Sequence, residues 1–538
     1  MTRRYFVGIY IVSLLVILGT SLIQSVPGYM DAEYYLVIGQ RLADGQTWQE
    51  PFLWNYLDQP AGIPHAANTY WMPLTSFLAA VGMLLAGRLD FFAARLPFMV
   101  LAACLAPLTA WMAYRIHADW REARLAGILA LFPGFYLAYY SITDNFVVYM
   151  LLGAAFLVAA FPEKYRLGPY PHAAARPALL GVLAGLMHLS RADGVLWLLA
   201  AMTLVSWPWP ASKKFSDLAG CLAVCLAGYG LVMLPWFLRN FQVYGAILSP
   251  ASAHALWITS YDQTFAYPAS GLNFQNWLAL GWQQHLLDRL SALSANLKNL
   301  LAVEGSIFLL PFMLVGMWKK RNDVRVQFVA ILWLVTFLIM TVIFPYAGGR
   351  GSFLHSGAAF QVLLWALVPY GLTLVVQWVA PRRNWNVPQA TQVFGIGLVL
   401  LAAGYTALSY TSVVIGQDVH QPAWQAGWES ARLAGGLLQE AGVDPEAIIM
   451  VNNPPGFYLA TGRPGLVIPD GGEETLLAAA HHYGASYLIL DQNYVQGLEE
   501  LFRAPGDRPG LDYLGGRQDI YLFRILPPVD GAGQENSQ

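Results

Sequence analysis

The chain has 538 residues, of which 57% are hydrophobic and 12% are charged, and its formal net charge at pH 7 is −2. A soluble protein carries about 25% charged residues, so this composition excludes an ordinary soluble enzyme, and the small net charge gives no indication of nucleic-acid binding. Many apolar runs approach the roughly 20 residues that cross a bilayer as a helix. The sequence therefore predicts an α-helical polytopic membrane protein whose partner is the lipid bilayer and not a nucleic acid.

The first apolar run follows a short basic stretch in "MTRRYFVGIY" and shows no small-residue cleavage site. We therefore predict that it is retained as the first span. About eleven spans of suitable length are expected along the chain. They are predicted at residues 5–27, 96–114, 125–142, 146–162, 178–190, 194–207, 217–238, 299–318, 326–344, 357–380 and 392–415. Residues 71–87 form a further apolar piece that is expected to lie in the interface or to re-enter the membrane.

The basic residues decide the orientation, because cytoplasmic loops carry an excess of Lys and Arg. In this topology every dense basic cluster falls on one side. The clusters lie at residues 3–4, 115–124, 164–176, 213–214, 319–325 and 382–383. The alternative, in which 71–87 crosses and 178–207 crosses only once, would move two of these clusters outside. We therefore predict a multi-pass protein of the plasma (inner) membrane with a cytoplasmic N-terminus and a periplasmic or extracellular C-terminal domain.

Polar residues gather at the predicted outer face. Two short half-spans are broken there by "SRADG", and short helices that end on charge are tolerated where they line protein or a wet cavity. Acids and arginines from separate segments meet at this level, as needed to hold an anionic lipid headgroup against a reactive centre. They are Asp31, Glu33, Asp144, Arg191, Asp193, Arg239, Arg350 and His355, joined by the outer loop from about 240 to 298 with Tyr261 and Asp262.

Residues 32–44 fit an amphipathic helix that starts after Asp31 and stops at Gly45. Asp31 and Glu33 are two positions apart, so on a helix their side chains point in different directions. They are therefore expected to do different jobs. The alternative is purely structural, with Asp31 as the N-cap and Glu33 as a first-turn acid favoured by the helix dipole.

The composition changes after residue 416, where charge and turn residues become frequent. Apolar runs of strand length bounded by turns lie at 447–453, 485–491 and 519–526, and residues 471–484 read as a capped helix ending at Gly484. No dinucleotide fingerprint is present. We predict a membrane domain over residues 1–416 and a small soluble α/β domain over residues 417–538.

Four segments together resemble a known family. "DAEYY" after the first span, "TYWMPLTSF", "LSRADGVLWL" and "LPWFLRNFQVYG" are similar, in this order, to motifs of the GT-C glycosyltransferases. The resemblance is to the branch (glycosyltransferase family 39-like) with the protein O-mannosyltransferases and the lipid A aminoarabinose transferases. Two segments depart from the pattern: "GGRGSFLHSG" replaces an Arg-Tyr-hydrophobic-Pro motif, and "NTYWMP" stands where His-Pro-Pro is common.

The resemblance implies a GT-C fold and an inverting transfer of a sugar from a polyprenyl-phosphate carrier to an acceptor hydroxyl on a protein, lipid or glycan. A carboxylate beside lipid is a suitable base, and arginine forks neutralise a phosphate. The implied catalytic residues are Asp31, as base, and Glu33. The implied phosphate-binding residues are Arg191, Arg239, Arg350 and His355. The implied acceptor or positioning residues are Asp144, Asp193, Tyr34, Tyr261 and Asp262.

Structural alternatives exist for several of these residues. The arginines could be interfacial anchors, Asp144 could cap the helix that follows it, and the loop at 257–268 could serve only as a rigid connection. No metal is required, and a divalent cation held by Asp31 with Glu33 or Asp144 stays open as an alternative. The rival functions are a transporter of lipid-linked sugars, which would be expected to show inverted repeats, and a non-catalytic glycan-binding scaffold.

The route of the lipid gives one further expectation. A polyprenyl chain has to enter sideways from the membrane, between "HLSRADGVLW" and the span ending at "LPWFLRN". We predict a groove with Arg191 and Arg239 at the same depth and with Asp31 within roughly 10 Å, the scale of a ligand-sized cavity.

Overall fold

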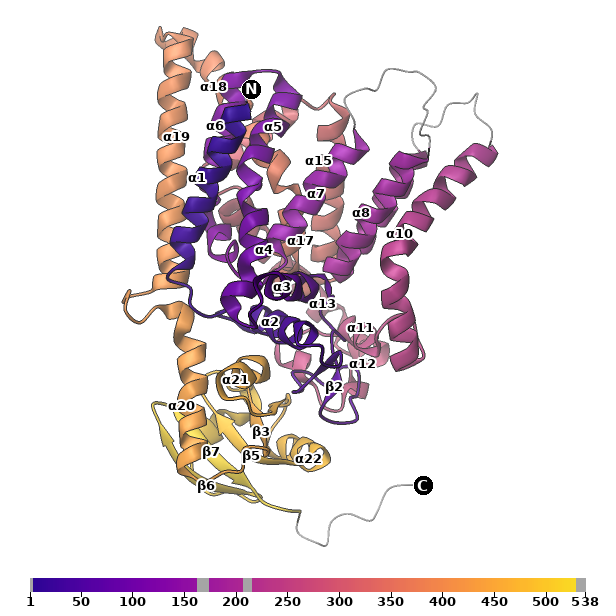
Figure 1. Ribbon diagram of the computed structural model, residues 1–538, viewed down its shortest axis with the longest axis vertical. Coiled ribbons are helices and arrows are strands. Elements are labelled where there is room, and N and C mark those ends of the chain that lie inside the picture. Colours follow the sequence, from indigo (N-terminus) through magenta and orange to yellow (C-terminus); the bar gives the residue numbers. More distant parts are fainter. Residues whose placement is uncertain (1–2, 162–173, 207–214, 529–538) are drawn as a thin grey trace. The chain divides into compact units, whose positions relative to one another are not determined.

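The computed structural model describes residues 3–161, 174–206 and 215–528 (Figure 1). The chain divides into two compact units, described here one at a time. The first comprises residues 1–25, 71–239 and 286–423, and the second comprises residues 26–70, 240–285 and 424–538. The ends of the predicted spans at 162 and 207, and the predicted basic residues Lys164, Arg166, Lys213 and Lys214, lie outside the described residues.

The first unit is helical. Six helices in the described part of the chain are long and apolar enough to cross a membrane, which makes this a multi-pass membrane protein. They are α1 (Arg3–Ser21), α4 with α5 (Phe91–Ala103 and Leu105–His117), α10 (Phe215–Tyr244), α15 with its π-turn (Val324–Leu338, Ile339–Ile343), α16 to α18 (Pro345–Arg383, with α17 at Phe353–Gly357 and α18 at Gln361–Arg383) and α19 with its π-turn (Val387–Tyr410, Thr411–Ile415). Each coincides with a predicted span.

Shorter apolar helices accompany the long ones. The predicted spans at 146–162, 178–190 and 194–207 correspond to α7 (Phe146–Ala160), α8 (Ala175–Ser190) and α9 (Val195–Ser206). The ambiguous piece at 71–87 is α3, a helix of 13 residues from Leu74 to Ala86. Both half-spans around "SRADG" are therefore present as separate helices, as predicted.

Two predicted spans are wrong as continuous helices. In place of 125–142, α6 (Trp120–Leu129) ends, the chain turns at Pro133 and at Gly134 with φ +64°, and a 3-10 helix follows at Gly134–Tyr139. In place of 299–318, α13 (Gly281–Asn299) runs into a π-turn at Leu300–Glu304, and α14 begins only at Leu310 and ends at Lys319. Proline, positive φ and π-turns interrupt the regular hydrogen bonding of a helix, and none of them changes hydropathy.

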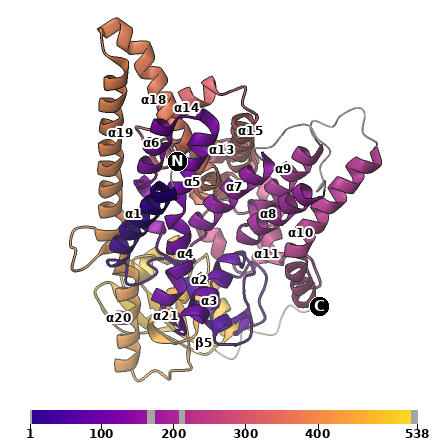
Figure 2. The same cartoon turned by 45° about the horizontal axis from the view of Figure 1, so that its top comes forward.

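Glycines let the helices of the first unit approach closely. In α8 a Cβ on Gly181 would lie 1.9 Å from the carbonyl oxygen of Cys225 in α10, and a Cβ on Gly228 in α10 would lie 2.3 Å from that of Ala178. Figure 2 shows α8 and α10 side by side. Small residues are the usual interface of packed membrane helices, because they bring two backbones together.

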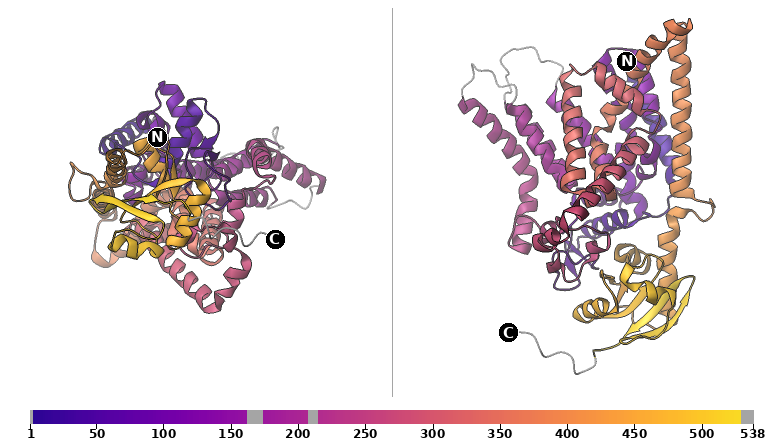
Figure 3. Two further views of the ribbon diagram at one scale, coloured as in Figure 1. Left: turned by 90° about the horizontal axis from the view of Figure 1, so that it is seen from below. Right: turned by 180° about the vertical axis from the view of Figure 1, so that it is seen from behind.

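The second unit contains a five-stranded sheet in the order β4-β3-β5-β7-β6. The strands are β3 (Ile448–Val451), β4 (Gly465–Val467), β5 (Ala485–Leu490), β6 (Leu511–Arg517) and β7 (Ile520–Ile525). Strand β3 is parallel to its two neighbours, β4 and β5. Strands β6 and β7 form an antiparallel hairpin, and β7 also pairs antiparallel with β5. Figure 3 shows this sheet in yellow with its helices beside it. The fold class predicted for the C-terminal part is confirmed.

Helices connect the parallel strands, because each pair of consecutive parallel strands needs a crossover connection. They are α21 (Pro454–Thr461) between β3 and β4 and α22 (Glu473–Tyr483) between β4 and β5, preceded by α20 (Ala426–Glu440) and followed by the short α23 (Glu499–Arg503). The predicted end of the helix is found at Gly484, which has a left-handed φ of +73°. Helices α20 and α21 cover a core of apolar residues that includes Leu438, Ile449, Phe457 and Leu522.

Two segments distant in sequence complete this unit. The first carries α2 (Met30–Ala43) and a short hairpin of β1 (Gln49–Glu50) and β2 (His65–Ala66), and the second carries α11 (Pro250–Ala255) and α12 (Phe274–Ala279). Leu53 exchanges backbone hydrogen bonds with the edge strand β4, at 2.9 Å to Gly465 and 2.8 Å to Val467. The compact unit is therefore larger than the predicted 417–538, because both segments pack on the α/β domain.

Candidate functional site

A helix break places the first candidate residues in the membrane unit. Helix α8 ends at Ser190, Arg191 takes an extended conformation with φ −151° and ψ 143°, and a short 3-10 turn at Ala192–Gly194 leads into α9. Gly194 is needed here because a Cβ would lie 2.3 Å from the backbone of Met187. The break turns Arg191 and Asp193 toward each other.

Arg191 and Asp193 form an ion pair that is linked to two other helices. Arg191 Nε donates to Asp193 Oδ1 at 2.8 Å, and both side chains are 13% exposed. The second oxygen, Asp193 Oδ2, accepts from Ser356 Oγ at 2.5 Å and from the Tyr149 hydroxyl at 3.4 Å. Arg191 Nη2 also reaches the carbonyl oxygen of Ser352 at 3.5 Å. The pair thereby joins the break to α7 and α17.

Asp144 and His355 lie in the same polar cluster. His355 Nδ1 is 2.9 Å from Asn145 Oδ1 and 4.0 Å from Asp144 Oδ1, and the His355 ring stacks on Phe146 with centroids 3.9 Å apart. Asp144 is 1% exposed. Its Oδ1 accepts from the backbone N–H of Asn145, whereas its Oδ2 is buried without a hydrogen-bond partner among the described residues. Asn145, and not Asp144, is the N-cap of α7.

Burial raises the pKa of Asp144 to about 7, although the N–H groups of Asn145 and Phe146 and the charge of Arg191 oppose the rise. A carboxyl with a pKa near 7 can hold or release a proton at neutral pH. Asp144, Arg191, Asp193 and His355, predicted from three separate segments, are thus brought together. We call these four residues the polar cluster.

Glu304 is a residue of this region that the sequence analysis missed. It is 1% exposed, and its Oε2 accepts from Trp333 Nε1 at 2.8 Å. A Cβ on Gly357, the neighbour of Ser356, would lie 1.8 Å from Glu304 Oε1. A single carboxyl inside a predicted apolar span, here 299–318, is itself a signal of function, and this signal could have identified Glu304 from the sequence.

The two other predicted phosphate-binding arginines occupy different surroundings. Arg239 lies on α10 with its guanidinium 5.0 Å from the centroid of the Trp236 ring. The rings of His188 in α8 and Phe237 in α10 are in contact, with centroids 6.4 Å apart. Arg191 follows His188 by three residues and Arg239 follows Phe237 by two, so each arginine comes directly after this contact between α8 and α10. Arg350 is exposed on a π-turn before α17, beside Gly351 with φ +131°.

In the second unit, Asp31 and Glu33 lie in the first turn of α2 but differ in burial. The helix begins at Met30 with Tyr29 as its N-cap, so the alternative of Asp31 as the N-cap is wrong. Asp31 is half-buried, whereas Glu33 is 2% exposed. Glu33 Oε2 accepts from Asn453 Nδ2 at 2.7 Å, and Asn453 is the N-cap of α21. Burial raises the pKa of Glu33 to about 7, with the Asn453 hydrogen bond opposing the rise and Asp31 adding to it.

Glu33 therefore links α2 to the start of α21. Its catalytic role stays a prediction. The Tyr34 hydroxyl is fully buried, donates to Glu50 Oε2 at 2.7 Å and accepts from the Asn68 N–H at 2.6 Å. Tyr34 therefore supports the segment after α1 from inside, and an acceptor would reach it only if that packing opened.

A buried acid–histidine–acid group continues from Tyr34 and was also missed. His65 Nδ1 lies 3.2 Å from Glu50 Oε1, and His65 Nε2 lies 2.8 Å from Asp58 Oδ2. Burial alone would lower the pKa of His65, but the hydrogen bonds that its ring N–H groups donate to Asp58 and Glu50 raise it to about 9. Glu50 and His65 are paired across the β1–β2 hairpin, and Asp58 lies in the connection between them. Asp58 and Glu50 precede His65 by 7 and 15 positions, a spacing with no periodic signal.

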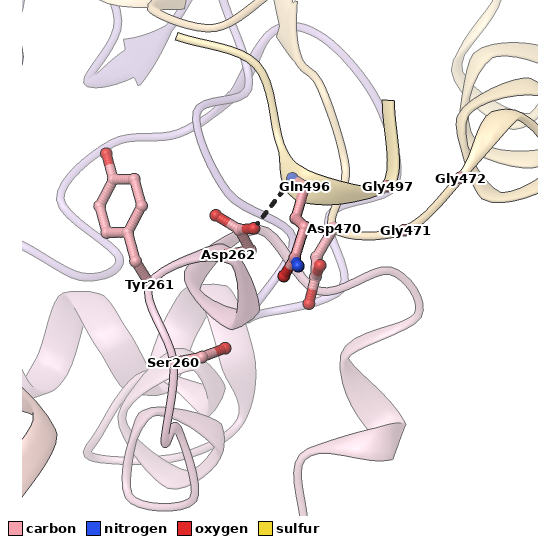
Figure 4. A pocket seen from close by; sticks show the side chains of 8 residues that line it. All are labelled: Ser260, Tyr261, Asp262, Asp470, Gly471, Gly472, Gln496 and Gly497. Atoms are coloured by element: carbon pink, nitrogen blue, oxygen red, sulfur yellow. Dashed lines mark hydrogen bonds between the residues drawn. The ribbon is translucent and has the colours of Figure 1, made fainter. Parts of the chain in front are cut away.

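The remaining predicted residues, Tyr261 and Asp262, lie in the second unit where a loop meets the α/β domain. Asp262 begins a 3-10 turn and its Oδ2 accepts from the backbone N–H of Gln496 at 3.2 Å. Both residues line an open pocket with Asp470 (Figure 4). The described residues contain no group of three or more His, Cys, Asp or Glu side chains that could hold a metal ion.

Comparison with solved structures identifies the fold. The crystal structure of the Archaeoglobus fulgidus oligosaccharyltransferase in the apo form matches with a TM-score of 0.57 at 13% identity, over 91% of this chain and 70% of that chain. The chain has the GT-C fold. The predicted GT-C resemblance is thereby confirmed at the level of the superfamily fold.

Two further structures of the A. fulgidus enzyme match equally well. Its oligosaccharyltransferase AglB in complex with an inhibitory peptide and a dolichol-phosphate matches with a TM-score of 0.57 at 13% identity, over 91% of this chain and 69% of that one. Its complex with Zn and sulfate matches with a TM-score of 0.57 at 15% identity, over 90% and 68%. A scan of protein-family models and a search of curated protein sequences give no match.

Proposed function

We propose that this GT-C protein is a glycosyltransferase that moves a hexose or pentose from a polyprenyl-phosphate carrier to an acceptor hydroxyl. The transfer takes place at the outer face of the plasma membrane and inverts the anomeric carbon. The observation that carries the proposal is the polar cluster. Ionisable residues inside a membrane domain are costly and usually functional, and here acid, arginine and histidine meet at the break between α8 and α9.

The donor phosphate is assigned to Arg191 and Arg239. An arginine offers a planar fork of donors that pairs with phosphate oxygens. The solved complex of AglB contains a dolichol-phosphate, which supports a lipid phosphate as the donor carrier for a chain of this fold. The two arginines follow one contact between α8 and α10, and such a pair could neutralise the charge that the leaving lipid phosphate develops.

The acceptor side is assigned to carboxylates. As the acceptor hydroxyl attacks, the anomeric carbon–oxygen bond to the lipid phosphate breaks, the new glycosidic bond forms, and the hydroxyl proton passes to a base. We assign this role to Asp31, which is only half-buried in the first turn of α2. Asp144 is assigned to positioning, because its Oδ2 has no partner among the described residues and can accept a hydrogen bond from a substrate.

Deletion of the coding sequence tests the proposal. Glycolipids and glycoproteins are extracted from the wild-type and deletion strains and compared by mass spectrometry. A single sugar should be missing from one acceptor class, and the matching polyprenyl-phosphate sugar should accumulate. The deletion strain is then complemented with the wild-type chain or with Asp31→Asn, and only the wild-type chain should restore the sugar. Identical glycan profiles in the wild-type and deletion strains would refute the assignment.

A further inference from the structure

An open pocket of about 460 Å³ lies wholly within the second unit, apart from the polar cluster. Its wall comes from three places: the loop before the 3-10 turn at Asp262, the segment after β4 that contains Asp470, and the turn at Gln496 and Gly497. The volume is inside the range of roughly 300–1,000 Å³ that is usual for small-molecule sites. The pocket is therefore large enough for a small ligand.

The charge of the pocket restricts the ligand. Asp262 and Asp470 both line it, and its eight lining residues include no Lys, Arg or His. Burial raises the pKa of Asp470, and the neighbouring charge of Asp262 adds to this rise. An ionised carboxylate accepts hydrogen bonds and has no hydrogen to donate. The pocket therefore disfavours anions and favours a ligand that presents O–H or N–H groups.

The backbone holds the two carboxylates in place. The N–H of Gln496 donates to Asp262 at 3.2 Å, and the N–H of Asp470 donates to the carbonyl oxygen of Phe265 at 3.0 Å. Next to these carboxylate-bearing segments, a Cβ on Gly497 would lie 2.1 Å from the carbonyl oxygen of Gly471, and Gly471 itself has φ +131°. Glycine is thus required at both positions, and the loop is tied to the α/β domain on both sides of the pocket.

An aromatic ring stands at the pocket as well. Tyr261 is 38% exposed and meets the Phe265 ring edge-on, with centroids 5.5 Å apart and an interplanar angle of 89°. Figure 4 shows Tyr261 on one side and Asp262, Gln496 and Asp470 on the other. The negative face of an aromatic ring attracts the weakly positive C–H groups of an apolar ligand face. A ligand suited to this pocket therefore combines hydroxyl groups with a C–H face.

We infer that this pocket binds a neutral saccharide, with the Asp262 and Asp470 carboxylates accepting hydrogen bonds from its hydroxyl groups and Tyr261 contacting its ring face. A divalent cation is the competing ligand for two carboxylates, because water can complete its coordination; the described residues offer no third His, Cys, Asp or Glu side chain for such a site. Binding itself does not depend on the proposed transfer reaction. The role of the pocket as a subsite for a glycan acceptor does rest on that proposed function.

The test uses the full-length protein in lipid nanodiscs and two probes, methyl α-D-mannopyranoside and methyl β-D-glucopyranoside. Saturation-transfer NMR should show saturable binding of at least one probe that EDTA does not abolish. Asp262→Asn and Asp470→Asn should each weaken binding about tenfold, because a hydrogen bond to a charged group is replaced by one to a neutral group. Tyr261→Ala should also weaken it, whereas the exposed control Glu446→Gln should bind as the wild type does.

Three results would overturn the inference: no saturable binding of either probe by the folded wild-type protein, unchanged affinity in both Asn variants, or binding only of added Ca²⁺. Thermal unfolding of each variant verifies that it is folded. Sugar transfer is measured separately, so the two proposals can fail independently. Probe binding without sugar transfer would support the saccharide site and contradict the transfer reaction. Sugar transfer without probe binding would contradict the saccharide site alone.

Discussion

Arg191 reaches its acidic partner because the chain leaves the helical conformation between them. An extended residue at the end of α8 turns the guanidinium onto Asp193, and Ser356 and Tyr149 bind the other carboxylate oxygen. A side chain held on several sides keeps its orientation without losing much further entropy when a ligand binds. At the scale of single residues, this ordered arginine is the strongest support for a phosphate site.

Replacement of Arg191 separates charge from shape. Arg191→Ala should lower kcat/KM for the polyprenyl-phosphate sugar by roughly ten- to a hundredfold, the loss expected for a hydrogen bond to a charged group. Arg191→Lys should recover only part of this, because lysine keeps the charge and loses the fork. Initial rates over a range of donor concentrations measure the effect, with Arg121→Ala on the exposed surface of α6 as the control. Donor kinetics in Arg191→Ala equal to those of the control would contradict the phosphate assignment.

The buried His65 group predicts a dependence of stability on pH. The pKa of His65 is raised from 6.5 to about 9 in the folded chain, so folding favours the charged imidazolium between Glu50 and Asp58. The stabilisation is complete below pH 6.5 and is lost as pH rises through about 9. The difference corresponds to an upper limit of about 3 kcal/mol.

Thermal unfolding of the purified protein between pH 6 and pH 10 measures this effect. The midpoint temperature of the wild type should fall across the window. His65→Gln should be less stable than the wild type at pH 6 and should lack most of the slope. An equal slope in both proteins would mean that His65 does not carry the effect.

At the scale of elements, the glycine contacts between α8 and α10 hold the segment that carries Arg191 beside the segment that carries Arg239. Hydropathy indicated where most of these helices lie, and the residues of "SRADG" indicated the break between α8 and α9. Hydropathy did not indicate that α6 and α14 are short. Their interruptions depend on a positive φ at Gly134 and on the π-turn before Gly305, which are backbone features of single residues.

Substitution of Gly181 tests this helix contact. Gly181→Ala places a Cβ 1.9 Å from the backbone of Cys225, so α8 and α10 have to move apart, at a cost of roughly 1–3 kcal/mol. Gly220→Ala in α10 is the matched control, because a Cβ there meets nothing within 4 Å and alanine favours the helix. Thermal unfolding in detergent should show a lower midpoint for Gly181→Ala only, and equal midpoints would show that the contact is not tight.

The candidate sites, like the helices, were predictable from the sequence only in part. The topology predicted from hydropathy and charge grouped Asp144, Arg191, Asp193 and His355 at one membrane level, and all four meet in one unit. The environment of Glu33 was not predictable, because its partner Asn453 lies 420 positions away. Asp470 was missed for a similar reason, since only tertiary packing brings it to Asp262. Sequence motifs indicate which residues carry chemistry, while long-range contacts decide which of them support the fold.

At the scale of the whole molecule, the proposal requires one orientation in the membrane. The basic clusters predict that the segment after Arg124 faces the cytoplasm and that the chain after residue 420 is outside. Fusions at both positions to a reporter pair, one active only in the cytoplasm and one only outside, measure this. Cytoplasmic activity after Arg124 and outside activity after residue 420 are expected. An outside signal after Arg124 would require α3 to cross the membrane and would remove Asp144 from the outer face.

The central claim is that the chain catalyses sugar transfer from a polyprenyl-phosphate carrier. It is tested most directly with the purified protein, the polyprenyl-phosphate sugar that accumulates in the deletion strain, labelled in its sugar, and acceptor extracted from that strain. The account predicts that the label moves to the acceptor and that polyprenyl phosphate is released in equal amount. It also predicts that Asp31→Asn, folded as judged by thermal unfolding, abolishes both. Release and transfer by the Asn variant at the wild-type rate would contradict the base assignment, and no transfer by the folded wild-type protein would contradict the account as a whole.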